Sequence, residues 1–301
     1  MTVPVLTVAR IPPACGLALS ESDYANLASS WITREIADAA MLRRVDTLEG
    51  REVICHKGKR DCAGMLIPYY WPDEPGPFNY RLRRDNPEWT EGKDGKPKPD
   101  RKYLGPPKSG NRLYIPPGVT VAQLQDITIT IAIVEGEKKA LALWRLARHE
   151  TERLRFIPIA IAGVWNWRGT VGKAIDPGGQ RIDLKGPIPD LGRVAWKNRK
   201  VFVVFDTNVH TDDSVSWARR GIGRELATRG AGVWFVNLPA DCGVNGVDDL
   251  LAVWGPARVL ELFDRSVSGV QLQVVSPPQF QSRPTGMFRV TKKGGCLRKS
   301  S

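Results

Sequence analysis

The chain has 301 residues, of which 42% are hydrophobic and 25% charged, and these proportions exclude a wholly disordered chain, a collagen and a coiled coil. The 44 lysines and arginines outnumber the 32 aspartates and glutamates, so the net charge is +12 at pH 7. A basic chain of this kind favours a polyanionic partner such as nucleic acid, although basic loops also simply keep a protein in solution. The charge alone therefore does not assign a function.

The first 118 residues predict a flexible arm and then a small α+β subdomain. Residues 1–19 contain three prolines and little periodicity, which is typical of a loose arm. Helices are predicted over residues 20–27, where Ser20 is a suitable N-cap, and over residues 33–42. Strands are predicted over residues 48–54 and 64–70, and the segment 72–117, rich in proline, glycine and charge, predicts further strands between long loops. The subdomain therefore spans residues 20–118.

Residues 119–266 predict a parallel sheet flanked by helices. Apolar, β-branched segments that are typical of buried parallel strands occupy residues 127–134, 156–162, 201–205 and 232–238. Amphipathic segments that predict helices occupy residues 137–149, 214–229, 248–254 and 256–263. This alternation of strand and helix is the pattern of an open α/β sheet. Residues 267–301 contain no acid, and we expect them to form a disordered basic tail.

Three acidic side chains follow the predicted strands at one edge of this sheet. Glu135 directly follows the first strand, Asp206 directly follows the third, and Asp248 comes after the fourth. Ligands of open parallel sheets bind beyond the carboxyl ends of the strands. Carboxylates brought together there repel each other unless a cation intervenes, and a divalent ion such as Mg²⁺ binds carboxylate oxygens. The sequence therefore predicts an acidic metal site that would also hold phosphate.

Each of these acids also has a structural explanation to be weighed. Asp248 precedes an apolar helix and would serve as its N-cap, while Glu135 at a helix start would gain from the helix dipole. Asp206 follows a wholly apolar strand, where an isolated carboxylate is costly unless it is paired or bound to metal. Asp206 is thus the acid that is hardest to explain by structure alone.

The residues around these acids resemble known motifs. Residues 134–141 resemble the glutamate motif of TOPRIM domains, residues 203–208 resemble their Asp-x-Asp motif, and residues 246–251 resemble the later acidic motif of the primase branch. Residues 27–45, 64–69 and 102–107 are similar to the N-terminal part of the bacterial replicative primase core. The resemblance covers about residues 20–263. It implies a TOPRIM-type parallel sheet flanked by helices, preceded by a smaller primase-core-like α+β subdomain.

The resemblance implies a role for each acid. Glu135 matches the acid proposed in such domains to act in general acid/base chemistry or to orient metal. Asp206 matches the first metal-binding aspartate, and Asp248 is the third acid, so these three are the candidate catalytic residues. Asn208 stands where the family usually has a second aspartate, and its neutral amide would weaken metal binding. The expected cofactor is Mg²⁺ or Mn²⁺, held by Glu135, Asp206, Asn208 and Asp248.

Basic and aromatic side chains near the acids are candidates for binding a single-stranded template. Residues 76–113 contain ten lysines and arginines against five acids, and bases stack on aromatic side chains interleaved with such charges. Lys138 and Lys139 at a helix start would reach phosphate, or they would form an ordinary solvated helix face. The candidate nucleic-acid-binding residues are Arg81, Arg83, Arg84, Lys102, Tyr103, Arg112, Lys138 and Lys139.

Other patterns in the sequence are weaker. Cys55, His56 and Cys62 lack the further ligands of a zinc site. Trp165 and Trp167 follow a strand, where they would line the mouth of the site or belong to the core. A P-loop motif does not occur, which argues against a helicase motor. The five scattered cysteines, the absence of a charged leader and the absence of an apolar run of roughly 18 residues favour a cytoplasmic protein without membrane contact.

These observations lead to one expected function and two alternatives. The resemblance implies primase-like, Mg²⁺-dependent nucleotidyl transfer on single-stranded DNA, with nucleotides as substrates, in the replication of a mobile element, plasmid or phage. A helicase or another replication protein is the further partner that the resemblance suggests. The alternatives are a non-catalytic nucleic-acid-binding TOPRIM module with a degenerate metal site, which Asn208 favours, and a TOPRIM nuclease.

Overall fold

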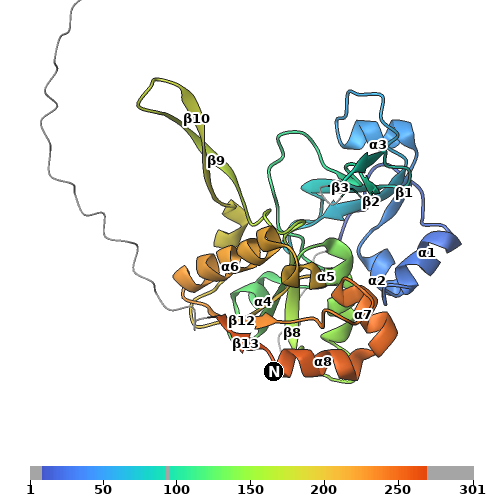
Figure 1. Cartoon of the computed structure of the whole chain (residues 1–301). Coiled ribbons are helices and arrows are strands. Elements are labelled where there is room, and N and C mark those ends of the chain that lie inside the picture. The colour runs from blue at the N-terminus through green and yellow to red at the C-terminus, as the bar shows by residue number, and fades with distance from the viewer. Residues whose placement is uncertain (1–8, 93–94, 96, 270–301) are drawn as a thin grey trace, which may run out of the picture. The chain divides into compact units, whose positions relative to one another are not determined.

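A computed structural model describes residues 9–92, 95 and 97–269 of the chain. The first residues of the predicted arm and residues 270–301 of the predicted tail lie outside the described residues. Within the described part, no helix is long and apolar enough to cross a membrane. Figure 1 shows the elements in chain order from blue to red.

The N-terminal subdomain is built on a small antiparallel sheet. Its strands β1 (Arg43–Val45), β2 (Gly64–Tyr69), β3 (Asn79–Arg84) and β6 (Tyr103–Leu104) lie in the order β1-β2-β3-β6. Two further strands, β4 (Trp89–Glu91) and β5 (Pro97–Pro99), form a separate ribbon. The helices α1 (Glu21–Ala28) and α2 (Arg34–Ala39) precede the sheet, and Ser20 caps α1 as the sequence predicts. Arg81 of β3 reaches the second half of the chain, where it contacts Glu137 and the carbonyl of Ala162.

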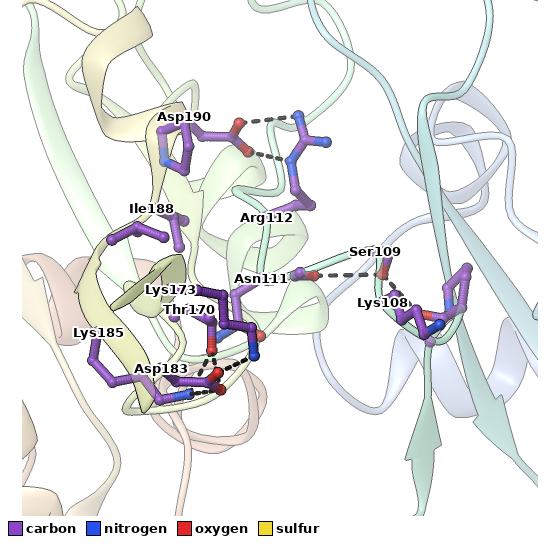
Figure 2. A pocket seen from close by; sticks show the side chains of 16 residues that line it. Lys108, Ser109, Asn111, Arg112, Thr170, Lys173, Asp183, Lys185, Ile188 and Asp190 are labelled. Carbon is purple, nitrogen blue, oxygen red and sulfur yellow. Dashed lines mark hydrogen bonds and ion pairs between the residues drawn. The ribbon is translucent and has the colours of Figure 1, made fainter. Parts of the chain in front are cut away.

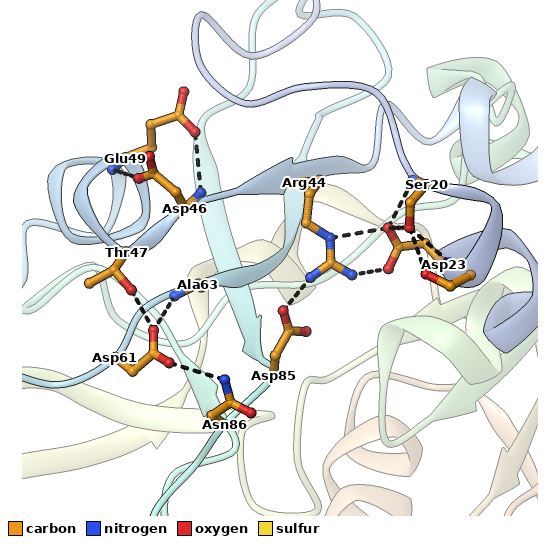
Figure 3. A network of polar contacts seen from close by, with 11 residues as sticks. Ser20, Asp23, Arg44, Asp46, Thr47, Glu49, Asp61, Ala63, Asp85 and Asn86 are labelled. Carbon is orange, nitrogen blue, oxygen red and sulfur yellow. Dashed lines mark hydrogen bonds and ion pairs between the residues drawn. The ribbon is translucent and has the colours of Figure 1, made fainter.

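The strand predicted over residues 48–54 is wrong, because this segment forms helix α3 (Thr47–Val53). The Asp46 carboxylate accepts hydrogen bonds from the backbone N–H groups of Leu48 and Glu49, and Glu49 accepts one from the backbone of Asp46. This reciprocal capping starts the helix and outweighs the β-branched residues at its end. Figure 3 shows the cap beside the contacts of Arg44 with Asp23 and Asp85, which join β1 to α1 and to the end of β3.

The predicted flexible arm needs a correction over its described part. Residue Ile11 donates its backbone N–H to the Pro75 carbonyl at 2.7 Å and accepts the Tyr70 hydroxyl at 2.7 Å. Leu17 pairs with Arg44 in an antiparallel bridge that extends the edge of the small sheet. Residues 9–19 are therefore held against the fold by main-chain hydrogen bonds, which proline content and weak periodicity do not reveal.

The second half of the chain confirms the predicted parallel sheet flanked by helices. Strands β7 (Thr130–Val134), β8 (Phe156–Ala160), β11 (Lys200–Val204) and β12 (Gly232–Val236) are parallel, in the order β12-β11-β7-β8. The short strand β13 (Val267–Ser268) pairs antiparallel with β12, so the first two residues of the predicted tail belong to the sheet. The helices are α4 (Val121–Gln125), α5 (Glu137–Leu146), α6 (Asp213–Thr228), α7 (Val247–Trp254) and α8 (Pro256–Asp264).

Alternate side chains of the parallel strands pack on opposite faces, as both faces of such a sheet are covered. Ala132, Val134 and Val204 pack in one cluster with residues of α5, α7 and α8, and residues of α1 and α2 join the same cluster. Ile133 and Val203 pack in a second cluster with residues of α6. Because the first cluster includes both halves of the chain, the small antiparallel sheet is fixed beside the parallel one.

Between β8 and β11 the chain forms a hairpin that no pattern in the sequence predicts. Its strands are β9 (Arg168–Ile175) and β10 (Arg181–Pro187), which pair only with each other. The short 3₁₀ helix η1 (Pro189–Arg193) follows the hairpin, and a second one, η2 (Thr207–His210), follows β11. Figure 1 shows the hairpin extending away from the sheet and its helices.

Candidate functional site

The candidate site lies where the direction of strand addition reverses in the parallel sheet. Strand β7 leads through α5 to β8 on one side, whereas β11 leads through α6 to β12 on the other. The carboxyl ends of neighbouring strands diverge at such a point and leave a crevice for ligands. Glu135 follows β7 and Asp206 follows β11, and the Asp206 backbone N–H donates to Glu135 Oε1 at 2.9 Å. Two predicted acids are therefore adjacent in space although 71 residues apart in sequence.

Lys139 lies among the acids and partly neutralises them. Its Nζ is 3.2 Å from Asp206 Oδ2, which also accepts a hydrogen bond from Asn245 Nδ2 at 3.1 Å. The negative charges of Asp206, Asp248 and Glu135 raise the pKa of Lys139, despite its burial, so it remains an ammonium ion. Lys139 thus acts as a counterion for the acids.

The approach of Asp248 to this cluster depends on a glycine. A Cβ atom at Gly246 would lie 2.4 Å from Asp248 Oδ1 and 2.9 Å from Lys139 Cε, so no larger residue fits there without a shift. Gly246 precedes α7, and the absent side chain lets the first turn of α7 approach Lys139. The structure thereby brings Glu135, Asp206 and Asp248, the three predicted catalytic acids, to one lysine.

Burial sets the protonation of the two acids at the strand ends. Burial, together with the negative charge of Asp206, raises the pKa of Glu135 to about 7, whereas Lys139 opposes the shift. Burial also raises the pKa of Asp206, although the neighbouring Lys139 counteracts the effect. Near neutral pH, Glu135 is therefore able both to take up and to release a proton, as general acid/base chemistry requires.

A pocket of about 390 Å³ opens at Glu135 and Asp248, and we call it the strand-end pocket; the buried Asp206 is not among its lining residues, although Lys139 and Asn245, which contact it, are. Glu135, Lys139, Asn245 and Asp248 line its acidic side. Its other side is mostly basic and is lined by the predicted residues Arg81, Arg83, Lys102, Tyr103 and Lys138. The arrangement combines acids that attract a cation with lysines and arginines that attract phosphate.

Several predicted residues take other positions. Arg84 is fully buried and donates to backbone carbonyls, including that of Asp61 at 2.6 Å, so it is not free to bind a template. Arg112 forms a two-point ion pair with Asp190 at 2.9 and 3.0 Å, outside the strand-end pocket. Asn208 lies in η2 and is not among the residues that line the pocket.

The two tryptophans do not line the strand-end pocket either. Trp167 is buried in the core, and the indole of Trp165 donates to the Ser214 hydroxyl of α6 at 3.2 Å. The suggestion that these indoles line the mouth of the site therefore finds no support in the geometry. Packing against α6 explains both positions.

Two residues without a clear motif in the sequence support the site. Glu137 is only 3% exposed and accepts hydrogen bonds from the Tyr69 hydroxyl and from Arg81 Nη1, the latter at 3.0 Å. Asn245 donates to Asp206 through its amide, and its backbone carbonyl accepts the Thr207 N–H at 3.0 Å. The only sequence signal for Glu137 is its place beside Glu135, and Asn245 lies in a loop whose sequence carries no signal.

The donor set fits a divalent cation in part. Oδ1 of Asp206 and Oδ1 of Asp248 are buried and have no hydrogen-bond partner within the described part of the chain. Buried oxygens of this kind are costly unless a ligand satisfies them. However, no three His, Cys, Asp or Glu side chains of the described residues lie together as a ready-made metal site. A metal ion at the two free oxygens would share the Asp206 carboxylate with the Lys139 ammonium, which contacts Oδ2.

The raised pKa of Glu135 predicts how stability changes with pH. Between about pH 4.5 and 7 the folded protein holds a proton that the unfolded chain has already released, so the free energy of unfolding falls as the pH rises through this range. In buffer with EDTA, Glu135→Gln should show a smaller decline and should unfold less readily than the wild type at pH 8. Urea unfolding at pH 5, 6, 7 and 8 measures the effect. The control Glu150→Gln, at an exposed position, should keep the decline of the wild type. If Glu135→Gln also kept it, the raised pKa of Glu135 would not be the cause of the decline.

Comparison with known proteins identifies a family model and solved structures that are similar to this chain. A family model described as a domain of unknown function (DUF3854) matches residues 121–258. No curated protein matches the chain. The Aquifex aeolicus primase structure with zinc-binding and RNA polymerase domains is similar, with a TM-score of 0.52 and 16% identity over 84% of this chain and 58% of that one. The structure of the DnaG catalytic core gives a TM-score of 0.51 and 14% identity over 84% of this chain and 75% of that one.

These comparisons show that the chain has a primase-core-like fold. The chain spans less than two thirds of the Aquifex aeolicus structure that it matches. Both halves of the chain take part in the likeness, since 84% of its residues are covered.

Proposed function

We propose that this protein is a primase-like enzyme that binds single-stranded DNA and nucleotides and carries out nucleotidyl transfer with Mg²⁺ or Mn²⁺. The observation that carries the proposal is the meeting of Glu135, Asp206 and Asp248 around Lys139 beside a basic pocket wall. The primase-core-like fold supports it, as does the resemblance of the acidic segments to TOPRIM motifs. Replication of a mobile element, plasmid or phage is the setting that this resemblance suggests, with a helicase or another replication protein as partner.

The side chains at the strand-end pocket would have different roles in such a reaction. Arg83, Lys102 and Lys138 on the basic wall would bind phosphates. The guanidinium of Arg81 lies over the ring of Tyr103 at 4.6 Å, so a base would stack on the other face of that ring. Glu135, whose pKa is about 7, would accept the proton of the attacking hydroxyl. Asp206 and Asp248 would hold the metal ion, which supplies charge neutralisation of the phosphates when bound. Lys139 would turn from the acids toward a phosphate.

One observation favours the non-catalytic alternative. In the structure the ammonium group of Lys139 already compensates the acids, and a neutral Asn208 replaces the usual second aspartate. A protein with this arrangement would bind nucleic acid through its basic wall without turnover. Nuclease activity would use the same acids and is distinguished by its product.

One experiment separates these functions. Labelled single-stranded DNA is incubated with the protein and Mg²⁺ or Mn²⁺, with and without nucleotides. New strands that appear only with nucleotides support the proposal, and shortened DNA in both reactions indicates a nuclease. A mobility shift without any new product indicates the non-catalytic module.

The variant Asp206→Asn tests whether the strand-end acids carry the activity. We expect synthesis to fall on the order of 10²-fold or more, because metal stabilisation of the transferred phosphate is worth several kcal/mol. DNA binding in EDTA should persist, since the basic wall is intact. The matched variant Glu150→Gln removes an exposed acid outside the pocket and should retain full synthesis. Equal rates in the wild type and Asp206→Asn would refute the assignment of the site.

A further inference from the structure

The β9–β10 hairpin has a charged face that the core does not explain. Lys173 and Lys185 both contact the same carboxylate, Asp183, and their side chains remain 51% and 53% exposed. Thr170 donates a hydrogen bond to this carboxylate at 3.1 Å and completes the cluster. Two lysines share one acid, so this face carries excess positive charge. The ribbon pairs with no other strand of the described part of the chain, so this charged face is not covered by a sheet.

A loop of the N-terminal half lies opposite this face. Its residue Lys108 has no ion-pair partner among residues 9–92, 95 and 97–269, and its backbone adopts the left-handed conformation with φ of +64°. Two side chains fix the end of the loop. Asn111 donates to the carbonyl of Arg168 at 2.8 Å, and Arg112 binds Asp190 at 2.9 Å. The loop is thereby pinned to the base of the hairpin.

The hairpin and this loop enclose a large pocket, which we call the hairpin pocket. Its volume is about 1150 Å³, and Figure 2 shows Lys173, Lys185 and Asp183 on one wall and Lys108 on the other. Four basic side chains line it against two acids. These residues are Lys108, Arg112, Lys173, Lys185, Asp183 and Asp190. The excess positive charge of these side chains favours a polyanion as the ligand.

The hairpin pocket is connected to the strand-end pocket. A third pocket of about 220 Å³ shares Arg81, Tyr103 and Ala162 with the strand-end pocket. It shares other residues with the hairpin pocket, among them Ser109 and Arg112. The three pockets therefore adjoin one another in a row from the acids, past Tyr103, to the lysines of the hairpin, and we call this row the groove.

We propose that a single nucleic-acid strand follows this groove and that the hairpin is a clamp whose Lys173 and Lys185, with Lys108 opposite, hold its phosphates beyond the acidic site. The identity of the ligand as nucleic acid rests on the proposed function. Its path to the hairpin is inferred from the row of adjoining pockets and from their positive charge. A strand long enough to reach the hairpin binds these lysines, whereas a short strand bound at the strand-end pocket does not.

The test measures binding in EDTA, by fluorescence anisotropy, of labelled single-stranded DNA of about 6 and about 20 nucleotides. The double variant Lys173→Gln/Lys185→Gln should bind the long strand several-fold more weakly and the short strand as the wild type does. The slope of log affinity against log salt for the long strand should become shallower by about 0.7 for each phosphate that the variant no longer neutralises. The charge-matched control Lys57→Gln/Lys59→Gln, in an exposed loop outside the groove, should leave the difference between long and short strands intact.

A second variant removes the clamp without relying on point charges. Residues 171–184 are replaced by Asn-Gly, which closes a two-residue turn between the paired residues Thr170 and Lys185. This protein keeps Lys185 but lacks Lys173 and the arms of the hairpin, so it should lose most of the difference in affinity between the long and the short strand. Equal weakening for short and long strands, or no weakening in either variant, would overturn the clamp. Because binding is measured without metal, a protein that lacks synthesis but shows the length dependence refutes only the proposed reaction.

Discussion

Replacing Glu135 with glutamine is expected to lower nucleotidyl transfer by about 10²–10⁴-fold, the usual contribution of a general base. Glutamine keeps an oxygen that accepts the Asp206 backbone N–H, so the geometry of the strand ends is preserved. It lacks the ability to take a proton, which Glu135 has near neutral pH because burial raises its pKa to about 7. The variant should bind single-stranded DNA in EDTA as the wild type does. A primer-synthesis time course under saturating template measures the rate.

The pH profile distinguishes a base from a structural role. Wild-type synthesis should rise with pH up to about 7 and then level off, because only the ionised form of Glu135 accepts a proton. In Glu135→Gln the residual rate should lose this rise. The control is Asp249→Asn, which changes an acid that lines the same pocket and accepts a hydrogen bond from Ser30 at 3.4 Å, and it should keep the wild-type profile. Normal synthesis by Glu135→Gln would exclude Glu135 as the base.

Replacing Arg81 with methionine should reduce the free energy of unfolding by about 3–5 kcal/mol, because it leaves the buried Glu137 carboxylate without its cation. Arg81 of β3 binds Glu137 of α5 at 3.0 Å and the carbonyl of Ala162 at 2.7 Å, so it joins the small sheet to the parallel sheet. Glu137 is 3% exposed, and Tyr69 alone cannot compensate its charge. Urea unfolding followed by circular dichroism measures the change.

Two further variants test the physical cause. Arg83→Met removes a cation of the same strand that has no ion pair in the described part of the chain. This variant should change the free energy of unfolding by no more than about 1 kcal/mol. The double variant Arg81→Met/Glu137→Gln should recover much of the stability, since replacing both members of a buried pair is far less costly than leaving one charge alone. Similar destabilisation in Arg81→Met and Arg83→Met would show that the ion pair contributes little. Because Arg81 has this structural role, weaker DNA binding by an Arg81 variant would not by itself prove contact with DNA.

The parallel half of the fold is readable from the sequence. Each of its four parallel strands is a short run of apolar residues, and a strand buried on both faces requires that composition whatever its neighbours are. Glu135 and Asp206 stand directly after such runs, so their place at the sheet edge follows from local pattern and from the rule for open sheets. The small antiparallel half is less readable. Residues 48–54 end in the β-branched pair Val53 and Ile54, which favours a strand, yet the segment forms a helix because the polar cap at Asp46 outweighs that preference.

Local sequence therefore establishes which acids lie at the ends of the strands, whereas the packing of the whole chain sets which basic residues are free. Arg84 and Arg81 belong to the same basic strand as Arg83. However, Arg84 donates a hydrogen bond to the Asp61 carbonyl and Arg81 forms an ion pair with Glu137. The role of Lys139 as counterion and the groove to the hairpin likewise depend on residues far apart in the chain. Periodicity reports which side of an element is buried, but the partner of a charge is set by the packing of distant elements, and no local pattern encodes it.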